Sequence, residues 1–260
     1  MRSAFITGAA SGIGRATAEL FVERGWFVGL ADIDAERVDA AAQALGERAA
    51  AFHLDVRQPE QWTAAIEAFG SATDGQMDLL FNNAGLGAAG WFEDIPAEVS
   101  ARMVEVNVLG TIHGVYACLP LLRATGGARL VNMSSVTSLY GVPQGAVYAA
   151  TKAAVRTLSE GLALELERLG IQVSDVCPTV IDTPMIDAPA YTEGPGSLRD
   201  GLVDPPRLVA EAVWAANARV HRPVGRGART MAWLTRLSPG LIRGLLRGGL
   251  RKRQQSLPEG

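Results

Sequence analysis

Short apolar runs alternate with longer amphipathic segments along the first two-thirds of this 260-residue chain. The apolar runs read as buried strands at 3–7, 26–31, 49–54, 77–82, 128–134 and 171–176. Helices are expected at 12–24, 34–45, 59–70, 97–124, 147–169 and 206–218. Strands that alternate with helices pair in parallel through crossover connections, and uninterrupted apolar strands fit a sheet covered on both faces. The pattern therefore predicts an α/β fold with a doubly wound parallel sheet, which binds ligands at the carboxyl ends of its strands.

Composition and charge indicate how the chain is organised. We expect one domain over residues 1–230, including a small substrate lobe at 184–206 that is rich in Pro, Gly and Asp. Residues 231–260 form a basic C-terminal helical extension, and the stretch 222–253 holds nine Lys or Arg and no acid. The net charge of −3 argues against a nucleic-acid binder. The sequence predicts neither a signal peptide nor a membrane span nor a metal site, so a cytoplasmic protein is expected.

The first expected strand ends in TGAASGIG, directly before the first expected helix. Gly8, Gly12 and Gly14 permit a tight turn and let the backbone approach a pyrophosphate, while the start of the helix offers free N–H groups to phosphates. A plain glycine-rich connection is the alternative interpretation. The flanking strand and helix favour a dinucleotide-binding loop.

Asp32 follows the second expected strand, about 20 residues beyond the glycines, where a carboxylate accepts hydrogen bonds from an adenosine ribose. The same carboxylate would repel a 2′-phosphate, and neither position 33 nor position 11 is basic. These features favour NAD over NADP. In the alternative interpretation, Asp32 only caps the helix that starts near Asp34.

Tyr148 and Lys152 stand four residues apart in the expected helix 147–169 and therefore share one of its faces. The chain uses Lys only twice among its 24 basic residues, so a Lys four positions after a Tyr is unusual. An ammonium group near a phenol stabilises the phenolate, so we expect the Tyr148 pKa to fall from about 10 toward neutral pH. Tyr148 is thus a candidate general acid or base, and Lys152 is also able to reach ribose hydroxyls.

Two further segments follow expected strands. Ser135 lies at the end of a strand, where its hydroxyl is placed to hydrogen-bond a substrate carbonyl oxygen. Ser134 is a competing candidate and Ser138 a weaker one. The segment NNAG at 82–85 follows the fourth strand, and its small residues let the backbone pack close to a cofactor.

Taken together, these residues resemble the short-chain dehydrogenase/reductase family over about residues 3–184. The resemblance also includes Asp55-Val56 after the third strand. It implies a Rossmann-type fold and a catalytic tetrad. By the resemblance, Tyr148 exchanges the substrate proton, Ser135 positions the substrate oxygen and Lys152 binds the nicotinamide ribose while tuning Tyr148. Asn107, in a helix, completes the tetrad and helps to hold a water that connects Lys152 to solvent.

The resemblance further implies a cofactor site that draws on several loops. Its residues are Gly8, Ser11, Gly12, Ile13, Gly14, Asp32, Ile33, Asp55, Val56, Asn82, Ala84, Gly85, Tyr148, Lys152, Pro178, Ile181 and Thr183. The chain departs from the family at Thr179, where Gly usually follows Pro, and in its C-terminal sequence. The second departure puts the common tetramer in doubt, so a homodimer through the helices near 100–124 and 147–169 is also considered.

These observations predict an NAD(H)-dependent oxidoreductase that moves a hydride between nicotinamide and a secondary alcohol or ketone. The expected substrate contacts are mostly apolar, which indicates a hydrophobic substrate; they are Ser135, Leu86, Val142, Gln144 and Met185. A catalytically silent, nucleotide-sensing binding protein on the same fold is the alternative.

The C-terminal extension alternates apolar residues such as Trp233 and Leu241 with Arg236, Arg243 and Arg247. Such a helix is able to cover the substrate pocket or a partner subunit, or to lie on an anionic membrane surface. Packing is the favoured interpretation, because amphipathic helices of soluble proteins usually face a core. A membrane-surface enzyme acting on lipid-like alcohols is a third hypothesis.

Overall fold

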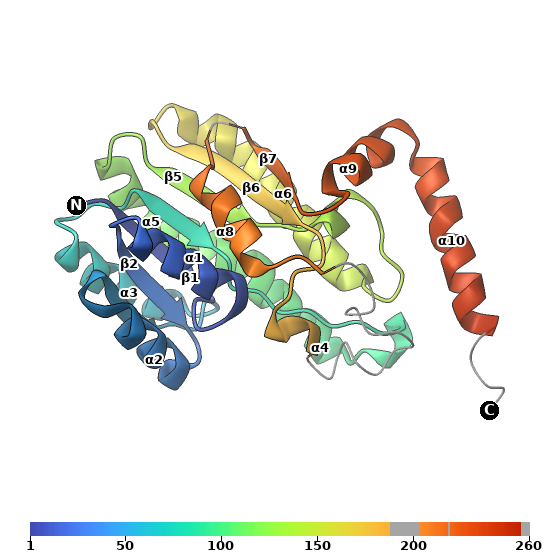
Figure 1. Ribbon diagram of the computed structural model, residues 1–260, viewed down its shortest axis with the longest axis horizontal. Helices are drawn as coiled ribbons and strands as arrows, with labels where there is room; N and C mark the ends of the chain where they lie inside the picture. Colours follow the sequence, from blue (N-terminus) through green and yellow to red (C-terminus); the bar gives the residue numbers. More distant parts are fainter. Residues whose placement is uncertain (188–202, 218, 256–260) are drawn as a thin grey trace.

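A single parallel sheet forms the centre of the molecule. The structure is a computed structural model and describes residues 1–187, 203–217 and 219–255, the last seven as backbone only. Within these residues the strand order is β3-β2-β1-β4-β5-β6-β7. The strands are β1 (Ser3–Thr7), β2 (Phe27–Asp32), β3 (Ala49–His53), β4 (Leu79–Asn82), β5 (Arg129–Met133), β6 (Gln172–Pro178) and β7 (His221–Val224) (Figure 1). The order reverses between β1 and β4, as in a doubly wound, Rossmann-type sheet. The predicted fold class is confirmed.

Helices cover both faces of this sheet (Figure 1). One face carries α1 (Gly12–Glu23), α2 (Ala35–Leu45) and α8 (Pro206–Trp214), and the other carries α3 (Pro59–Ala72), α5 (Gly110–Ala124) and α6 (Ala146–Glu167). The predicted elements agree with these bounds to within two residues, except that the helix expected at 206–218 ends at Trp214. There the guanidinium of Arg129 donates hydrogen bonds to the carbonyls of Trp214 and Ala216 and satisfies the helix end.

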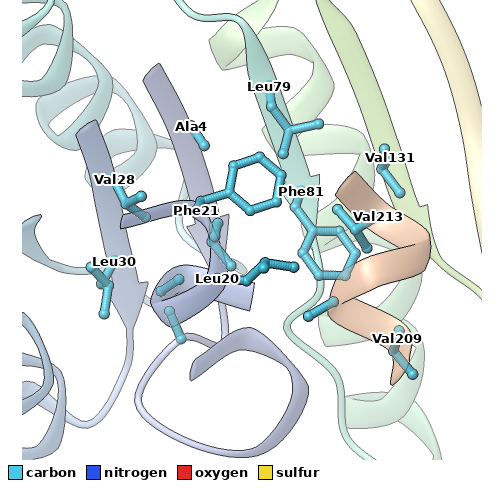
Figure 2. Packing of buried hydrophobic residues seen from close by; sticks show 14 of the residues in the cluster. Ala4, Leu20, Phe21, Val28, Leu30, Leu79, Phe81, Val131, Val209 and Val213 are labelled. Atoms are coloured by element: carbon cyan, nitrogen blue, oxygen red, sulfur yellow. The ribbon is translucent and has the colours of Figure 1, made fainter. Parts of the chain in front are cut away.

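Each face of the sheet is closed by its own apolar cluster. In Figure 2, Leu20 and Phe21 of α1 belong to one cluster with Phe81 of β4 and Val213 of α8. Leu80, the neighbour of Phe81, belongs to the cluster on the opposite face. Successive side chains of a strand point to opposite faces, so β4 is anchored on both sides. This packing fixes the carboxyl end of the strand, beside which the functional residues lie.

β7 was not expected from the sequence. Its four residues, HRPV, contain the charged Arg222, and Pro223 cannot donate to a sheet ladder. The strand is tolerated because it is the edge of the sheet and pairs with β6. His221 Nδ1 also lies 2.5 Å from the buried carboxylate of Asp175 on β6, which helps to hold the edge in place.

α4 (Ala97–Val104), a π-helical turn at Glu105–Leu109 and α5 form one continuous helical run. By length and a mean hydropathy of 1.2, this run passes as a candidate membrane span. However, Met103, Val115 and Leu122 of the run are buried in the fold, and one such helix does not indicate a membrane protein.

Apolar side chains also lie on the outside of these helices. Val104, Leu109 and Tyr116 of the run are exposed, as is Leu164 of α6. They lie on the two helices expected to form a dimer interface, and the homo-oligomer stays a prediction.

The C-terminal extension forms α9 (Ala228–Leu237) and α10 (Pro239–Gln255). α9 contacts β7 and the 3₁₀ turn at Val136–Leu139, and α10 packs against α9 while projecting away from the body of the molecule (Figure 1). The predicted packing is met on the inner face, where Ala228 and Ile242 are buried. The outer face is exposed, and the separation of this extension from a domain ending at residue 230 stays a prediction.

Most of the predicted substrate lobe at 184–206 lies outside the described residues. Pro184–Asp187 forms a 3₁₀ turn, and Asp204 pairs with Ile181 in an isolated bridge. The ends of the lobe therefore lie beside the end of β6.

Candidate active site

A cavity of about 910 Å³ opens at the carboxyl ends of the strands. Most of the predicted cofactor residues line it, together with all of the predicted substrate residues. The lining predicted residues are Gly8, Ser11, Gly12, Ile13, Asp32, Ile33, Asp55, Val56, Ala84, Gly85, Leu86, Ser135, Val142, Gln144, Tyr148, Lys152, Pro178, Ile181, Thr183 and Met185. Gly14, Asn82 and Asn107 lie outside this lining. The structure thus brings residues from distant segments to the switch point of the sheet.

The glycine loop is tightly packed against the end of β4. Gly8 has a φ of +65°, and a Cβ there would lie 2.9 Å from the Cα of Ala84. A Cβ at Gly14 would lie 2.1 Å from the carbonyl oxygen of Gly8, so α1 starts directly against the loop. The side chain of Ser11, the N-cap residue of α1, makes no hydrogen bond with the first N–H groups of this helix. The glycine loop thus forms a backbone cradle that any side chain would fill. Its free N–H groups fit a dinucleotide pyrophosphate.

Asp32 stands beside this loop at the end of β2. Its carboxylate accepts hydrogen bonds from the backbone N–H of Ala10 at 3.0 Å and of Asp34 at 3.1 Å. The cap of α2 is Asp34, whose side chain accepts from the N–H of Arg37. The alternative in which Asp32 caps this helix is therefore wrong, and its carboxylate lines the cavity instead.

Asp55 is paired with an arginine that was missed from the sequence. Arg57 lines the same cavity and holds the Asp55 carboxylate through two side-chain nitrogens, with Nε donating at 2.9 Å to Oδ1. The hydrogen bonds from Arg57 hold the pKa of Asp55 below its usual value. Arg57 also lies 3.6 Å from Glu105, so this end of the cavity combines cationic and anionic groups. A short-range i, i+2 pair in a loop carries no periodicity by which it could be recognised.

Asn82, expected as a cofactor contact, is buried and lies outside the cavity lining, and its cofactor role stays a prediction. Its Nδ2 donates to Asn132 Oδ1 at 3.0 Å, inside the sheet. Its neighbour Asn83 lines the cavity and donates from Nδ2 to the carbonyls of Thr7 and Gly8 at 2.8 and 3.1 Å. Because side-chain direction alternates along a strand, the side chains of these adjacent asparagines leave the end of β4 in opposite directions. Asn83 therefore holds the shape of the glycine loop.

Tyr148 and Lys152 lie on one face of α6, as expected. The Lys152 ammonium nitrogen is 5.7 Å from the centroid of the Tyr148 ring and donates to the carbonyl of Met133 at 3.0 Å. Lys152 is only 3% exposed. The hydroxyl of Ser135, at the N-cap of a 3₁₀ turn after β5, interacts with that of Tyr148. The phenol, the ammonium and the serine hydroxyl therefore converge on one part of the cavity.

Their pKa values differ from the sequence-based expectation. Burial raises the pKa of Tyr148 to about 12, against the opposing effect of its hydrogen bond with Ser135. Burial also lowers the pKa of Lys152 to about 8, a change that nearby Cys177 partly opposes. The expected fall in the Tyr148 pKa is therefore not found in the protein alone, because loss of solvent outweighs the hydrogen bond with Ser135. At neutral pH Tyr148 is a protonated phenol.

The competing serines have other partners. Ser134 Oγ donates to the backbone carbonyl of Lys152 at 3.0 Å, and Ser138 Oγ donates to the carbonyl of Ser135 at 2.6 Å. Both hydroxyls stabilise the backbone around the site. Ser135 is the serine whose side chain meets Tyr148.

Asn107 lies in the π-helical turn between α4 and α5, and such turns are frequent at functional sites. Its side-chain amide bonds both backbone groups of Leu86, at 2.8 and 2.9 Å, and donates to Thr151 Oγ1 at 3.0 Å. A Cβ at Gly85 would lie within 3.5 Å of both Asn107 Oδ1 and Lys152 Nζ. Asn107 therefore lies close to Lys152 and fixes Leu86 in the cavity wall, while its water-holding role stays a prediction.

Thr179, where the resembled family has Gly, has a local explanation. Its hydroxyl donates to Asp204 Oδ2 at 3.1 Å. A Cβ at Gly225, which has a φ of +98°, would lie 2.2 Å from that hydroxyl. Gly225 thus provides the space that Thr179 occupies. Met231 of α9 is a further cavity residue that was missed, because its sequence position gave no sign that the extension returns to the site.

Known proteins resemble this chain over most of its length. A sequence model of the short chain dehydrogenase family matches residues 2–193. The "probable oxidoreductase EphD" of Mycobacterium tuberculosis is 36% identical over 93% of this chain, which spans 44% of the length of that relative. The 3-alpha-(or 20-beta)-hydroxysteroid dehydrogenase of Mycobacterium tuberculosis is 37% identical over 71% of this chain and 70% of its own.

Two solved structures have the same arrangement of elements. The 3-ketoacyl-(acyl-carrier-protein) reductase from Brucella melitensis, complexed with NADH, has a TM-score of 0.78 at 29% identity and covers 85% of this chain and 95% of its own. The alcohol dehydrogenase from the archaeon Thermococcus sibiricus, complexed with 5-hydroxy-NADP, has a TM-score of 0.74 at 28% identity, with coverage of 85% and 94%.

The buried ammonium of Lys152 predicts a pH-dependent effect on stability. Its pKa is about 8 in the folded chain against an ordinary 10.5, so burying its charge destabilises the fold below pH 8, and this cost disappears as the pH rises toward 10.5. We expect Lys152→Met to raise the free energy of unfolding by about 2 kcal/mol near pH 7 and by less near pH 10. This figure is the gain from removing the buried charge, reduced by the lost hydrogen bond to the Met133 carbonyl. Urea denaturation at both pH values measures this, with Lys252→Met as the control for loss of one lysine. A destabilised variant at pH 7 would contradict it.

Proposed function

We propose that this chain, which belongs to the short chain dehydrogenase family, is a nicotinamide-dependent oxidoreductase that interconverts a hydrophobic secondary alcohol and its ketone. The observation that carries this proposal is the convergence of Tyr148, Ser135 and Lys152 on a cavity that begins at the glycine loop. A nicotinamide dinucleotide would supply or accept the hydride. The residues of the chain bind and orient the reactants and move the proton.

The proton is assigned to Tyr148. In the reduction of a ketone, its protonated phenol donates to the substrate oxygen, and in the oxidation of an alcohol the phenolate takes the proton back. The Ser135 hydroxyl donates a hydrogen bond to the same oxygen and holds it in place. Lys152 supplies the positive charge that favours the phenolate. The raised pKa of Tyr148, about 12, keeps the proton-donating form populated in the protein alone.

NAD is proposed over NADP as the cofactor. Asp32 places a carboxylate beside the glycine loop, and the exposed side chain that follows it, Ile33, carries no positive charge. A 2′-phosphate at this position would be repelled and would gain no cationic partner from these two residues. With NAD, oxidation of the alcohol is the proposed direction in the cell.

The proposed substrate is hydrophobic and bulky. Leu86, Val142 and Met185 contribute apolar side chains to the cavity, and α9 adds Met231. Gln144 is the polar exception among the predicted substrate contacts. The resemblance to a hydroxysteroid dehydrogenase supports a bulky secondary alcohol.

Removal of the phenol hydroxyl tests the proposed chemistry. With a substrate found in a panel of secondary alcohols and ketones, we expect Tyr148→Phe to reduce kcat by about 10²–10⁴-fold, because it removes the proton donor. NADH absorbance measures the rate. Tyr140→Phe is the matched control, since Tyr140 lines the same cavity, and we expect little change. Undiminished turnover by Tyr148→Phe would refute the assignment and favour the nucleotide-sensing alternative.

Removal of the Asp32 charge tests the cofactor assignment. We expect Asp32→Ser to lower the ratio of kcat/KM with NAD to that with NADP by about tenfold or more, because ribose hydrogen bonds and phosphate repulsion are lost together. Asp39→Ser is the matched control. It removes the same charge from an exposed residue that pairs with His53 at the end of β3, and it should leave the ratio unchanged. A wild-type enzyme that prefers NADP, or a variant with an unchanged ratio, would overturn the assignment.

A further inference from the structure

The stretch 222–253, which contains α9 and most of α10, concentrates the positive charge of the chain. Residues 222–253 hold nine of the 24 basic residues and none of the 27 acidic ones, which leaves 15 basic and 27 acidic residues, a net charge of −12, in the remainder. On α9 and α10, the arginines at 229, 236, 243 and 247 are exposed. This separation of charge gives the extension an electrostatic character opposite to that of the body.

The same two helices expose large apolar side chains. Trp233 and Leu237 on α9 are 68% and 69% exposed, and Leu241 and Leu245 on α10 are 50% and 63% exposed. Each pair is spaced by four residues and so forms a stripe on one helix face. Ala228 of α9 and Ile242 of α10 are buried, so the exposed stripes are the outward faces of helices that already have an inner contact.

Basic and apolar groups are neighbours on this surface. Arg229 lies four residues before Trp233 and Arg236 three residues after it, so both flank the indole on the surface of α9. Arginine stems lie along apolar surface while their guanidinium groups reach phosphates, and Trp is favoured where an apolar medium meets water. The combination fits a surface that is apolar in its middle and anionic at its edge.

We propose that the outward face of α9 and α10 binds the surface of an anionic lipid bilayer. The exposed leucines and Trp233 enter the boundary between headgroups and acyl chains, and the flanking arginines pair with lipid phosphates. The negative surface charge of such a bilayer complements the positive charge of this segment, which runs for more than thirty residues without an acidic side chain. In Figure 1, α10 stands away from the body, and its Leu241, Leu245 and Arg243 side chains are exposed.

The cavity lies next to this surface. Met231, two residues before Trp233, lines the cavity from the inner side of α9. Bilayer binding would therefore place the cavity beside a store of hydrophobic alcohols. This last step rests on the proposed function, whereas binding to the bilayer does not.

Co-sedimentation with vesicles tests the proposal without any assay of catalysis. The full chain is mixed with phosphatidylcholine vesicles that contain or lack phosphatidylglycerol. We expect binding to the anionic vesicles that weakens as salt is raised, and at least about tenfold weaker binding to the neutral ones. Arg243→Glu/Arg247→Glu and Trp233→Ser/Leu237→Ser should each reduce binding to anionic vesicles by about tenfold or more.

The matched control is Arg123→Glu/Arg168→Glu, which changes the net charge equally at exposed positions on α5 and at the end of α6. Circular dichroism verifies that each variant is folded. Equal binding by the control and the Arg243/Arg247 variant, or no binding by the wild-type chain, would overturn the proposal. A second result would also overturn it: a wild-type chain that does not bind vesicles but self-associates in light scattering, with this self-association lost in Trp233→Ser/Leu237→Ser. The surface would then bind a second copy of the chain.

Discussion

The buried ammonium group of Lys152 beneath the end of β5 is the interaction on which the site depends. Its donation to the carbonyl of Met133 joins α6 to the sheet, and the chain on either side is held by matching bonds. Asn132 Nδ2 donates to Ser159 Oγ at 2.9 Å, and Ser134 Oγ donates to the Lys152 carbonyl. Asn132 and Ser134 are two residues apart and so share a face of the strand. These polar contacts between the end of β5 and α6 fix the position of the helix against the sheet, and hence the position of Tyr148.

Much of this arrangement could be predicted because it follows from periodicity and from residue type. The alternation of apolar runs fixed the order of strands and helices, and the spacing of Tyr148 and Lys152 fixed their shared face. Gly8 and Gly14 could be recognised because glycine marks positions where close backbone contacts leave no room for a side chain, and Gly8 also has a positive φ. The carboxyl ends of parallel strands then bring these segments together without any knowledge of loop structure.

The rest depends on three-dimensional context that a linear pattern does not hold. The roles of Asn82 and Asn83 are divided by the direction in which each side chain leaves the end of β4. β7 is held by its place at the sheet edge rather than by an apolar pattern. The direction of the shift in the Tyr148 pKa depends on burial, which outweighs the hydrogen bond with Ser135. The outward faces of α9 and α10 are likewise exposed because their inner faces already have contacts.

The most direct test of the central claim is the ionisation of Tyr148 itself. The chain has four tyrosines, so ring-labelled protein gives few carbon signals, and Tyr148→Phe identifies the relevant one. In the presence of saturating NAD⁺, we predict that Tyr148 titrates below the value of about 12 that burial imposes on the protein alone, and at lower pH in the wild type than in Lys152→Met. A Tyr148 pKa that stays near about 12 with NAD⁺ bound, or is the same in both proteins, would contradict the account.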